Sequence, residues 1–309
     1  METPTSSRQN KHIHWSFNSD LMNNPIIAKE LKGRMRGRQG FVLLTAYLAL
    51  ISLVIASIYL YATSNGNFSR GDPNSLQSLG KLIFNSVVLL EFLMIVFIGP
   101  ALTSGAISSE RERGTLDVLR TTLLSSNALV WGKLGSAAMY LLLLVFTALP
   151  LQSLAFFLGG VDVAEMIISL LMLAASVFLF CTLGLYFSSM SKRTLTATVL
   201  SYTALIFPVI ILVFLFYLQR NGGLDFSSMS IDVQRVIIDS GWVLFSTNPV
   251  TAALLAEMIL MDRQSLFLLY VPDFSLALFS PWILFLIFAV TMTILMIWLI
   301  VFYLNRYEH

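Results

Sequence analysis

The stretch FVLLTAYLALISLVIASIYLYA, residues 41–62, runs without a single charged side chain. A helix needs about 20 predominantly apolar residues to cross the hydrocarbon core of a membrane. The stretch meets that length, and it is too long and lacks the small-residue cleavage site of a removable signal peptide. We therefore predict that residues 41–62 form a retained transmembrane helix.

The composition of the whole chain agrees with a membrane protein. Of the 309 residues, 57% are hydrophobic and only 12% are charged, whereas soluble domains carry about 25% charged residues. The net charge of +2 is too small to indicate nucleic-acid binding. One cysteine, Cys181, excludes an internal disulfide framework. No metal site is predicted, because His12, His14 and His309 have no cysteine or carboxylate arranged around them.

Five further stretches can cross a membrane, so the chain is predicted to be an all-α polytopic protein with six transmembrane helices. Glu91 is the one charged residue that falls inside a predicted span. In chain order, the predicted spans are 41–62, 82–107, 134–158, 166–190, 195–218 and 282–304.

The segment 219–281, between the fifth and sixth spans, is longer than a simple link. Its stretch WVLFSTNPVTAALLAEMILM, residues 242–261, is almost long enough to cross, but Pro249 and Glu257 would be costly in contact with lipid. We expect helical structure that packs on the outer face or re-enters the membrane part way. A seventh span, which would put the C-terminus outside, is the alternative.

Lysine and arginine residues set the expected orientation. Most of the 19 basic residues lie in the N-terminal 40 residues, in the link 108–133, at Lys192 and Arg193, and at Arg306 near the C-terminus. Because cytoplasmic segments are rich in Lys and Arg, these segments should all face the cytoplasm. The chain is therefore expected to be a multi-pass plasma-membrane protein with both termini inside.

A polar tail, residues 1–22, precedes the stretch NNPIIAKELKGRMRGRQG, residues 23–40. Asn24 and Pro25 suit the start of a helix, and apolar residues then recur every four positions. This pattern predicts a helix in the membrane interface, with its cations near lipid headgroups. The alternative is a basic flank without fixed structure, which Gly33 and Gly37 favour. The predicted headgroup ligands are Lys29, Lys32, Arg34, Arg36 and Arg38.

The link between the second and third spans contains SSERERGTLDVLRTTLLSS, residues 108–126, with four consecutive charges. Thr115 can cap a helix that begins at Leu116, and Asp117 suits its positive first turn. Leu116, Leu119 and Leu123 then share one side of that helix, and Ser125 or Ser126 can cap the next one. Spanning a membrane requires no such patch, although a charged link that only enforces topology would also carry charges here.

The stretches ISSERERGTLDVL, TTLLSS and GKL resemble the cytoplasmic signature of type-2 ABC exporter permeases, as does NPIIAKELKGRMRGR ahead of the first span. The order of elements extends this resemblance over most of the chain. It implies a coupling helix that sits in a groove of a separate ATP-hydrolysing subunit. Leu123 and Ser126 depart from the family, which often has proline there. The implied contact residues are Glu110, Arg111, Glu112, Arg113, Gly114, Thr115, Leu116 and Asp117.

The resemblance also implies a permease domain over 41–309 that pairs with a second copy or a related subunit, in a bacterial inner membrane. The chain has no P-loop, because the Gly-Lys pairs in LGKL (79–82) and WGKLGS (131–136) lack both the upstream glycine and the following hydroxyl. We therefore expect no ATPase activity in this chain, with ATP and Mg²⁺ bound by the partner.

Glu91 lies near the middle of the second span, where an ionised group costs about 3 kcal/mol. It is a candidate for a contact in a transport path or gate. Alternatively, it is protonated, or bonded to Asn85 or a neighbouring hydroxyl. The alternative for the whole protein is a membrane scaffold or a membrane-embedded enzyme. An enzyme would need several ionisable groups inside the membrane, whereas the predicted spans contain a single charged residue, Glu91.

Overall fold

The computed structural model describes residues 33, 38–64, 73–115, 126–220, 230–249, 251–252, 255, 267–271 and 276–306. Six helices within these ranges are long and apolar enough to cross a membrane. The protein is therefore an all-α polytopic membrane protein. The long helices are α2 (Arg38–Ser64), α3 (Pro73–Thr103), α6 (Ser126–Phe157), α7 (Val163–Met190), α8 (Thr194–Arg220) and α11 (Pro281–Arg306).

Each long helix matches one predicted span, but the ends differ. Helix α3 ends at Thr103 rather than at 107, and α6 ends at Phe157. Helix α3 begins at Pro73 rather than at 82, because proline is well suited to a first helical turn. Helix α6 begins at Ser126, so residues 126–133 belong to this helix, as the predicted capping by Ser125 or Ser126 requires. Helix α7 begins after Asp162, whose side chain accepts a 2.7 Å hydrogen bond from the Val163 amide.

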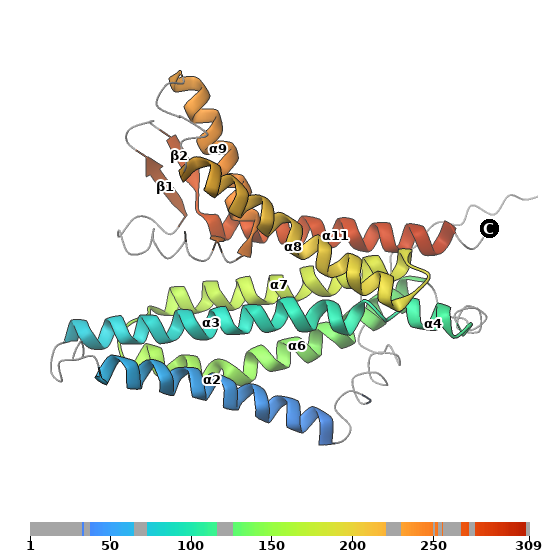
Figure 1. Ribbon diagram of the computed structural model, residues 1–309, viewed down its shortest axis with the longest axis horizontal. Helices are drawn as coiled ribbons and strands as arrows, with labels where there is room; N and C mark the ends of the chain where they lie inside the picture. The colour runs from blue at the N-terminus through green and yellow to red at the C-terminus, as the bar shows by residue number, and fades with distance from the viewer. Residues whose placement is uncertain are drawn as a thin grey trace, which may run out of the picture.

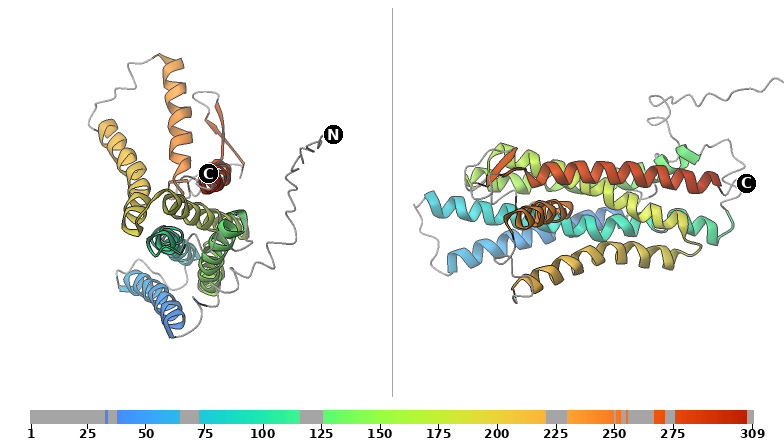
Figure 2. Two further views of the ribbon diagram at one scale, coloured as in Figure 1. Left: turned by 90° about the vertical axis from the view of Figure 1, so that its right-hand side faces the viewer. Right: turned by 90° about the horizontal axis from the view of Figure 1, so that it is seen from above.

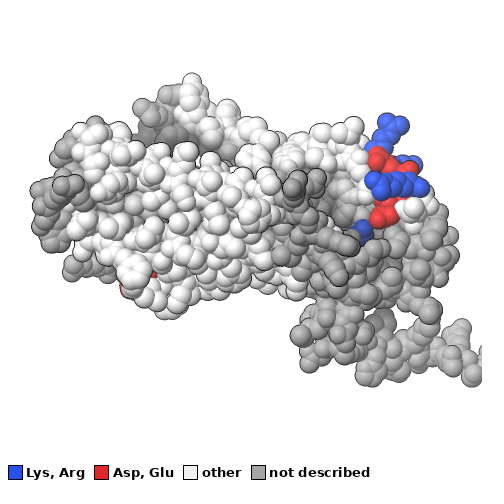
Figure 3. Space-filling model, turned by 90° about the horizontal axis from the view of Figure 1, so that it is seen from below, with Lys and Arg blue, Asp and Glu red and all other residues white. Residues whose placement is uncertain are grey.

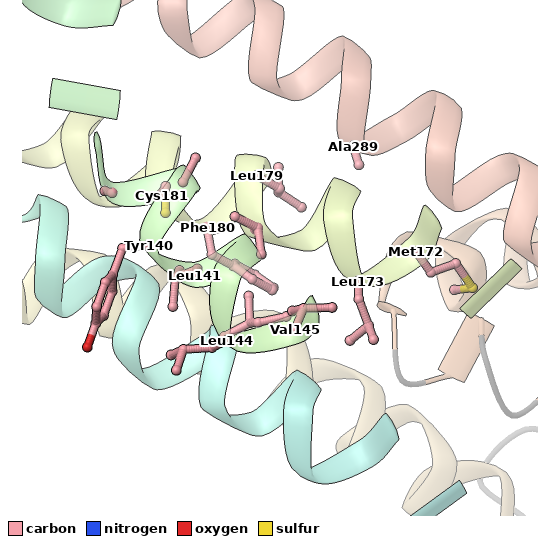
Figure 4. Packing of buried hydrophobic residues seen from close by; sticks show 14 of the residues in the cluster. Tyr140, Leu141, Leu144, Val145, Met172, Leu173, Leu179, Phe180, Cys181 and Ala289 are labelled. Carbon is pink, nitrogen blue, oxygen red and sulfur yellow. The ribbon is translucent and has the colours of Figure 1, made fainter. Parts of the chain in front are cut away.

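The helices form one elongated bundle in which α3 and α7 are central (Figure 1). A view along the bundle has α2 and α6 on one side of this central pair, and α8, α9 (Ile231–Thr247) and α11 on the other (Figure 2). The apolar side chains of α6 and α7 pack together in the interior, and Ala289 of α11 faces α7 (Figure 4). Gly184 of α7 lets α3 approach closely, because a Cβ there would lie 2.9 Å from Pro100 Cα.

The segment 219–281 contains helix α9 and, in addition, a two-stranded ribbon. Strands β1 (Leu268–Val271) and β2 (Leu276–Phe279) pair antiparallel. The expectation of an entirely helical segment was therefore incomplete. The indole Nε1–H of Trp242 donates a 2.9 Å hydrogen bond to the Phe279 carbonyl, which ties α9 to the ribbon.

Several chain segments meet at one end of the bundle. Helix α4 (Ser108–Glu112), the α7–α8 turn (191–193) and the end of α11 all lie at the right-hand end of Figure 1. The turn between α6 and α7 and the β1–β2 ribbon lie at the opposite end (Figure 1). We call the first of these the α4 end. The proposed interfacial helix falls outside the described residues except for Gly33 and 38–40, and Arg38 is the first residue of α2.

Candidate functional site

A cluster of charged side chains lies at the α4 end (Figure 3). Seen from below, blue and red atoms cluster there, whereas most of the bundle is white (Figure 3). Three elements contribute the cluster: α4 and its following turn, the α7–α8 turn, and the first turns of α6. Its members are Glu110, Arg111, Glu112, Arg113, Lys133, Lys192 and Arg193.

Most of the charged run is itself a short helix. Helix α4 spans Ser108–Glu112, and the chain leaves it through Gly114, whose φ of 68° is the left-handed conformation that glycine adopts readily. The Thr115 hydroxyl bonds back to the Glu110 carbonyl at 3.2 Å and to the Glu110 carboxylate. The helix predicted to begin at Leu116, with Asp117 in its first turn, lies outside the described residues.

The start of α4 is held by a serine from α7. The Ser188 Oγ accepts hydrogen bonds from the Ile107 amide at 2.9 Å and from the Ser108 amide at 3.0 Å. The Ser188 side chain is 0% exposed. Because the first amides of a helix have no partner within it, Ser188 supplies the cap that Ile107, the residue at the cap position, cannot provide.

Arg111 binds the end of α7. Its guanidinium donates a 2.8 Å hydrogen bond to the Ser191 carbonyl and a 3.1 Å hydrogen bond to the Ser189 carbonyl. The last carbonyls of a helix are unpaired and lie at its negative end. Arg111 therefore satisfies these carbonyls with a charge of the favourable sign.

Glu112 makes the complementary contact with the start of α8. Its carboxylate accepts a hydrogen bond from the Thr194 amide at 2.9 Å and another from the Thr194 hydroxyl at 3.0 Å. A carboxylate is favourable at the positive, amide-bearing end of a helix. Two adjacent residues of α4 thus hold both sides of the α7–α8 turn.

Glu110 and Lys133 connect the same region to α6. The Lys133 ammonium donates a 2.7 Å hydrogen bond to the Ala106 carbonyl and lies 3.7 Å from a Glu110 carboxylate oxygen. Lys133 is mostly buried, so this cation is held against the turn that leads into α4. Helices α6, α7 and α8 are therefore all bonded to one short segment.

Arg113 differs from its three neighbours in the charged run. Its side chain is exposed, and no hydrogen bond to it is found among the described residues. Lys192 and Arg193 are also exposed in the α7–α8 turn, next to the residues that α4 holds. The α4 end thus presents exposed cations, while Glu110, Arg111 and Glu112 bind within the chain.

The sequence analysis identified the charges but not their partners. The run SSMSKRT, residues 188–194, supplies every acceptor and donor that Arg111, Glu112 and the start of α4 use in this turn. An unusual density of Ser and Thr next to two cations was the available signal. It could not be assigned without knowing that α4 and the α7–α8 turn lie at the same end.

Glu91 is buried inside the bundle, at 1% exposure. Its two carboxyl oxygens accept hydrogen bonds from the Gln152 Nε2 of α6, at 2.9 and 2.8 Å. The suggested partner Asn85 was wrong, because the contact runs between helices rather than along α3. Glu91 lies away from the α4 end and is not part of the charged cluster.

A scan against models of known protein families gives no match for this chain, and a search of curated proteins gives none either. The fold defines a multi-pass helical membrane protein. The α4 end is a charged surface, and hydrogen bonds join it to α6, α7 and α8.

Proposed function

We propose that the chain is the permease subunit of an ATP-driven exporter, and that a separate ATPase subunit acts on it through residues 108–126. The observation that carries this proposal is the hydrogen bonding of α4. One short segment holds the end of α7 through Arg111, the start of α8 through Glu112, and the start of α6 through Lys133. A displacement of α4 would therefore be passed to three long helices at once.

Coupling to an ATPase requires a docking surface as well as transmission of movement to the helices. The exposed charges supply this surface. Exposed charges at the rim of an interface mainly fix orientation and partner choice. Arg113, Lys192 and Arg193 are exposed at the α4 end and available for a contact of that kind. In this proposal the α4 end faces the cytoplasm, both termini are inside, and the partner provides the ATP and Mg²⁺ sites. A second copy or a related permease subunit completes the transporter.

The structure separates two groups of residues that a test must treat differently. Changing all four residues from Glu110 to Arg113 would break the internal bonds together with any docking contact. Docking is better tested with Arg113→Ala combined with Lys192→Ala, because both side chains are exposed. Transmission is better tested with Arg111→Ala and Glu112→Ala, which remove bonds to the α7–α8 turn.

The experiment is co-expression with a P-loop ATPase encoded beside this gene, followed by co-purification and ATPase assay in lipid. We expect the docking variant to co-purify with about one tenth of the ATPase subunit that the wild type binds. A tenfold loss of affinity corresponds to about 1.4 kcal/mol of binding free energy. We expect the transmission variants to retain the ATPase but to lose its stimulation by the permease.

Leu195→Ala is the matched control, because Leu195 is exposed on α8 beside the same turn and makes no charged contact. It should leave binding and stimulation unchanged. The proposal fails if the docking variant binds the ATPase as well as the wild type does, or if no P-loop protein binds the wild type.

A further inference from the structure

Glu91 of α3 and Gln152 of α6 form a polar contact that the proposed ATPase coupling does not use. Both side chains are 1% exposed, in the interior of the helix bundle. The Gln152 Nε2 donates to both Glu91 oxygens, at 2.9 and 2.8 Å. The question is which protonation state of Glu91 this contact can support.

An ionised Glu91 leaves two groups poorly satisfied. Within the part of the chain that the structure describes, the carboxyl interacts with the Gln152 amide and with Tyr47 of α2, and no cation lies against it. A buried carboxylate without a positive partner is strongly disfavoured. In addition, the buried Gln152 Oε1 has no hydrogen-bond partner among the residues that the structure describes, which is a further cost.

A proton on Glu91 removes both costs together. With the Gln152 amide tilted so that both of its polar atoms face the carboxyl, the carboxyl O–H donates to the Gln152 Oε1, while the Nε2–H still donates to the other carboxyl oxygen. A protonated carboxyl and an amide each offer one donor and one acceptor, so the two groups are complementary. The result is a neutral pair with two hydrogen bonds and no orphaned acceptor.

We propose that Glu91 is a proton-binding site, held as a neutral carboxylic acid that pairs with the Gln152 amide and joins α3 to α6. The helices that pack against α3 offer few other titratable groups at this level. Tyr47 of α2 lies within electrostatic range of the carboxyl, and Tyr202 of α8 donates its hydroxyl to the Phe97 carbonyl at 2.6 Å. On α6 and α7 the remaining candidates lie elsewhere along the helices: Lys133, Tyr140, Glu165, Cys181 and Tyr186.

Infrared spectroscopy tests the proposal directly. The purified full chain is measured in lipid at neutral pH, where a free Glu with a pKa of about 4.3 is ionised. The wild-type spectrum minus that of Glu91→Gln should contain the carbonyl band of a protonated carboxyl, and this band should move in D₂O. A difference spectrum that contains carboxylate bands instead overturns the proposal.

Two further variants keep the test decisive. Gln152→Leu keeps Glu91 but removes its partner, so the carbonyl band should shift to higher frequency; an unshifted band overturns the pairing. This variant also serves if Glu91→Gln does not fold. Glu165→Gln, at the start of α7, is the matched control and should leave the protonated-carboxyl region unchanged. Neither outcome depends on ATPase binding, so failure here leaves the coupling proposal intact.

Discussion

Ser188 illustrates how one small residue fixes the position of a charged segment. Its hydroxyl oxygen accepts from two successive amides at the start of α4 and is completely buried. The hydroxyl also donates toward the Ser108 Oγ at 3.3 Å. Water cannot replace these bonds at a buried position, so the loss of the oxygen leaves both amides unsatisfied.

Ser188→Ala should therefore destabilise the protein by about 1–3 kcal/mol, the cost of leaving a buried donor unpaired. Thermal unfolding of the purified chain in detergent measures this as a lowered midpoint. Ser57→Ala is the control, because the exposed Ser57 hydroxyl bonds only to the Leu53 carbonyl of its own helix. Equal shifts for the two variants would contradict the capping role.

Arg111 and Glu112 show why neighbouring opposite charges are useful beside a helix–turn–helix connection. The end of α7 presents carbonyls and the start of α8 presents amides, so the two positions favour opposite charges. Reversing the pair, with Arg111→Glu and Glu112→Arg together, keeps composition and net charge but places each charge at the wrong helix end.

We expect the reversed pair to unfold at a lower temperature than either single alanine variant, because each helix end then faces a like charge. Thermal unfolding at low salt is the appropriate measurement, and added salt should reduce the difference by screening. A reversed variant as stable as the wild type would show that the sign of the charges is irrelevant there.

At the scale of helices, the contact between α3 and α7 depends on a small residue. Helix α3 passes directly over Gly184 of α7. A side chain at 184 would meet the Thr103 Oγ1 and the backbone of Pro100. Backbone atoms cannot give way, so the two central helices would have to separate.

Gly184→Val should cost about 1–3 kcal/mol, the usual range for an overpacked interior. Size-exclusion profiles and thermal unfolding in detergent would record the effect. Gly105→Ala is the matched control, because a Cβ at Gly105 meets nothing within 4 Å. If both variants are equally stable, the close approach of α3 to Gly184 does not limit the stability of the protein.

At the scale of the whole molecule, the helices bring α4, the α7–α8 turn and the end of α11 to the α4 end (Figure 1). The turn between α6 and α7, which contains Asp162, lies at the other end. Cys181, the one native cysteine, is 0% exposed, so labelling of introduced cysteines has a low background.

In the proposed orientation, Asp162→Cys should react with a membrane-impermeant maleimide in intact cells. Lys192→Cys and Arg113→Cys should react only after the cells are permeabilised. Labelling is read by gel shift or mass spectrometry. The reverse pattern would place the α4 end outside and would remove the basis for ATPase docking, while labelling of all three from one side would contradict the bundle itself.

The six spans were predictable because hydropathy is a property of each segment alone. Residues 73–81 were missed as part of α3 because they are too polar to count toward a span, although they are helical. The ribbon was missed because strands of four residues carry little periodicity. Charge content marked the link 108–126, but its hydrogen bonds could not be predicted in the same way.

The sequence by itself determined that this chain is a helical membrane protein and that the link 108–126 carries a dense run of charges. Only the tertiary structure decided which charged side chains bond to other parts of the chain. Arg111 and Glu112 meet the α7–α8 turn, and Glu91 meets Gln152, across 61 to 82 residues of chain. Such contacts depend on the relative depth and rotation of helices, which interhelical packing sets and which a helix's own sequence does not encode.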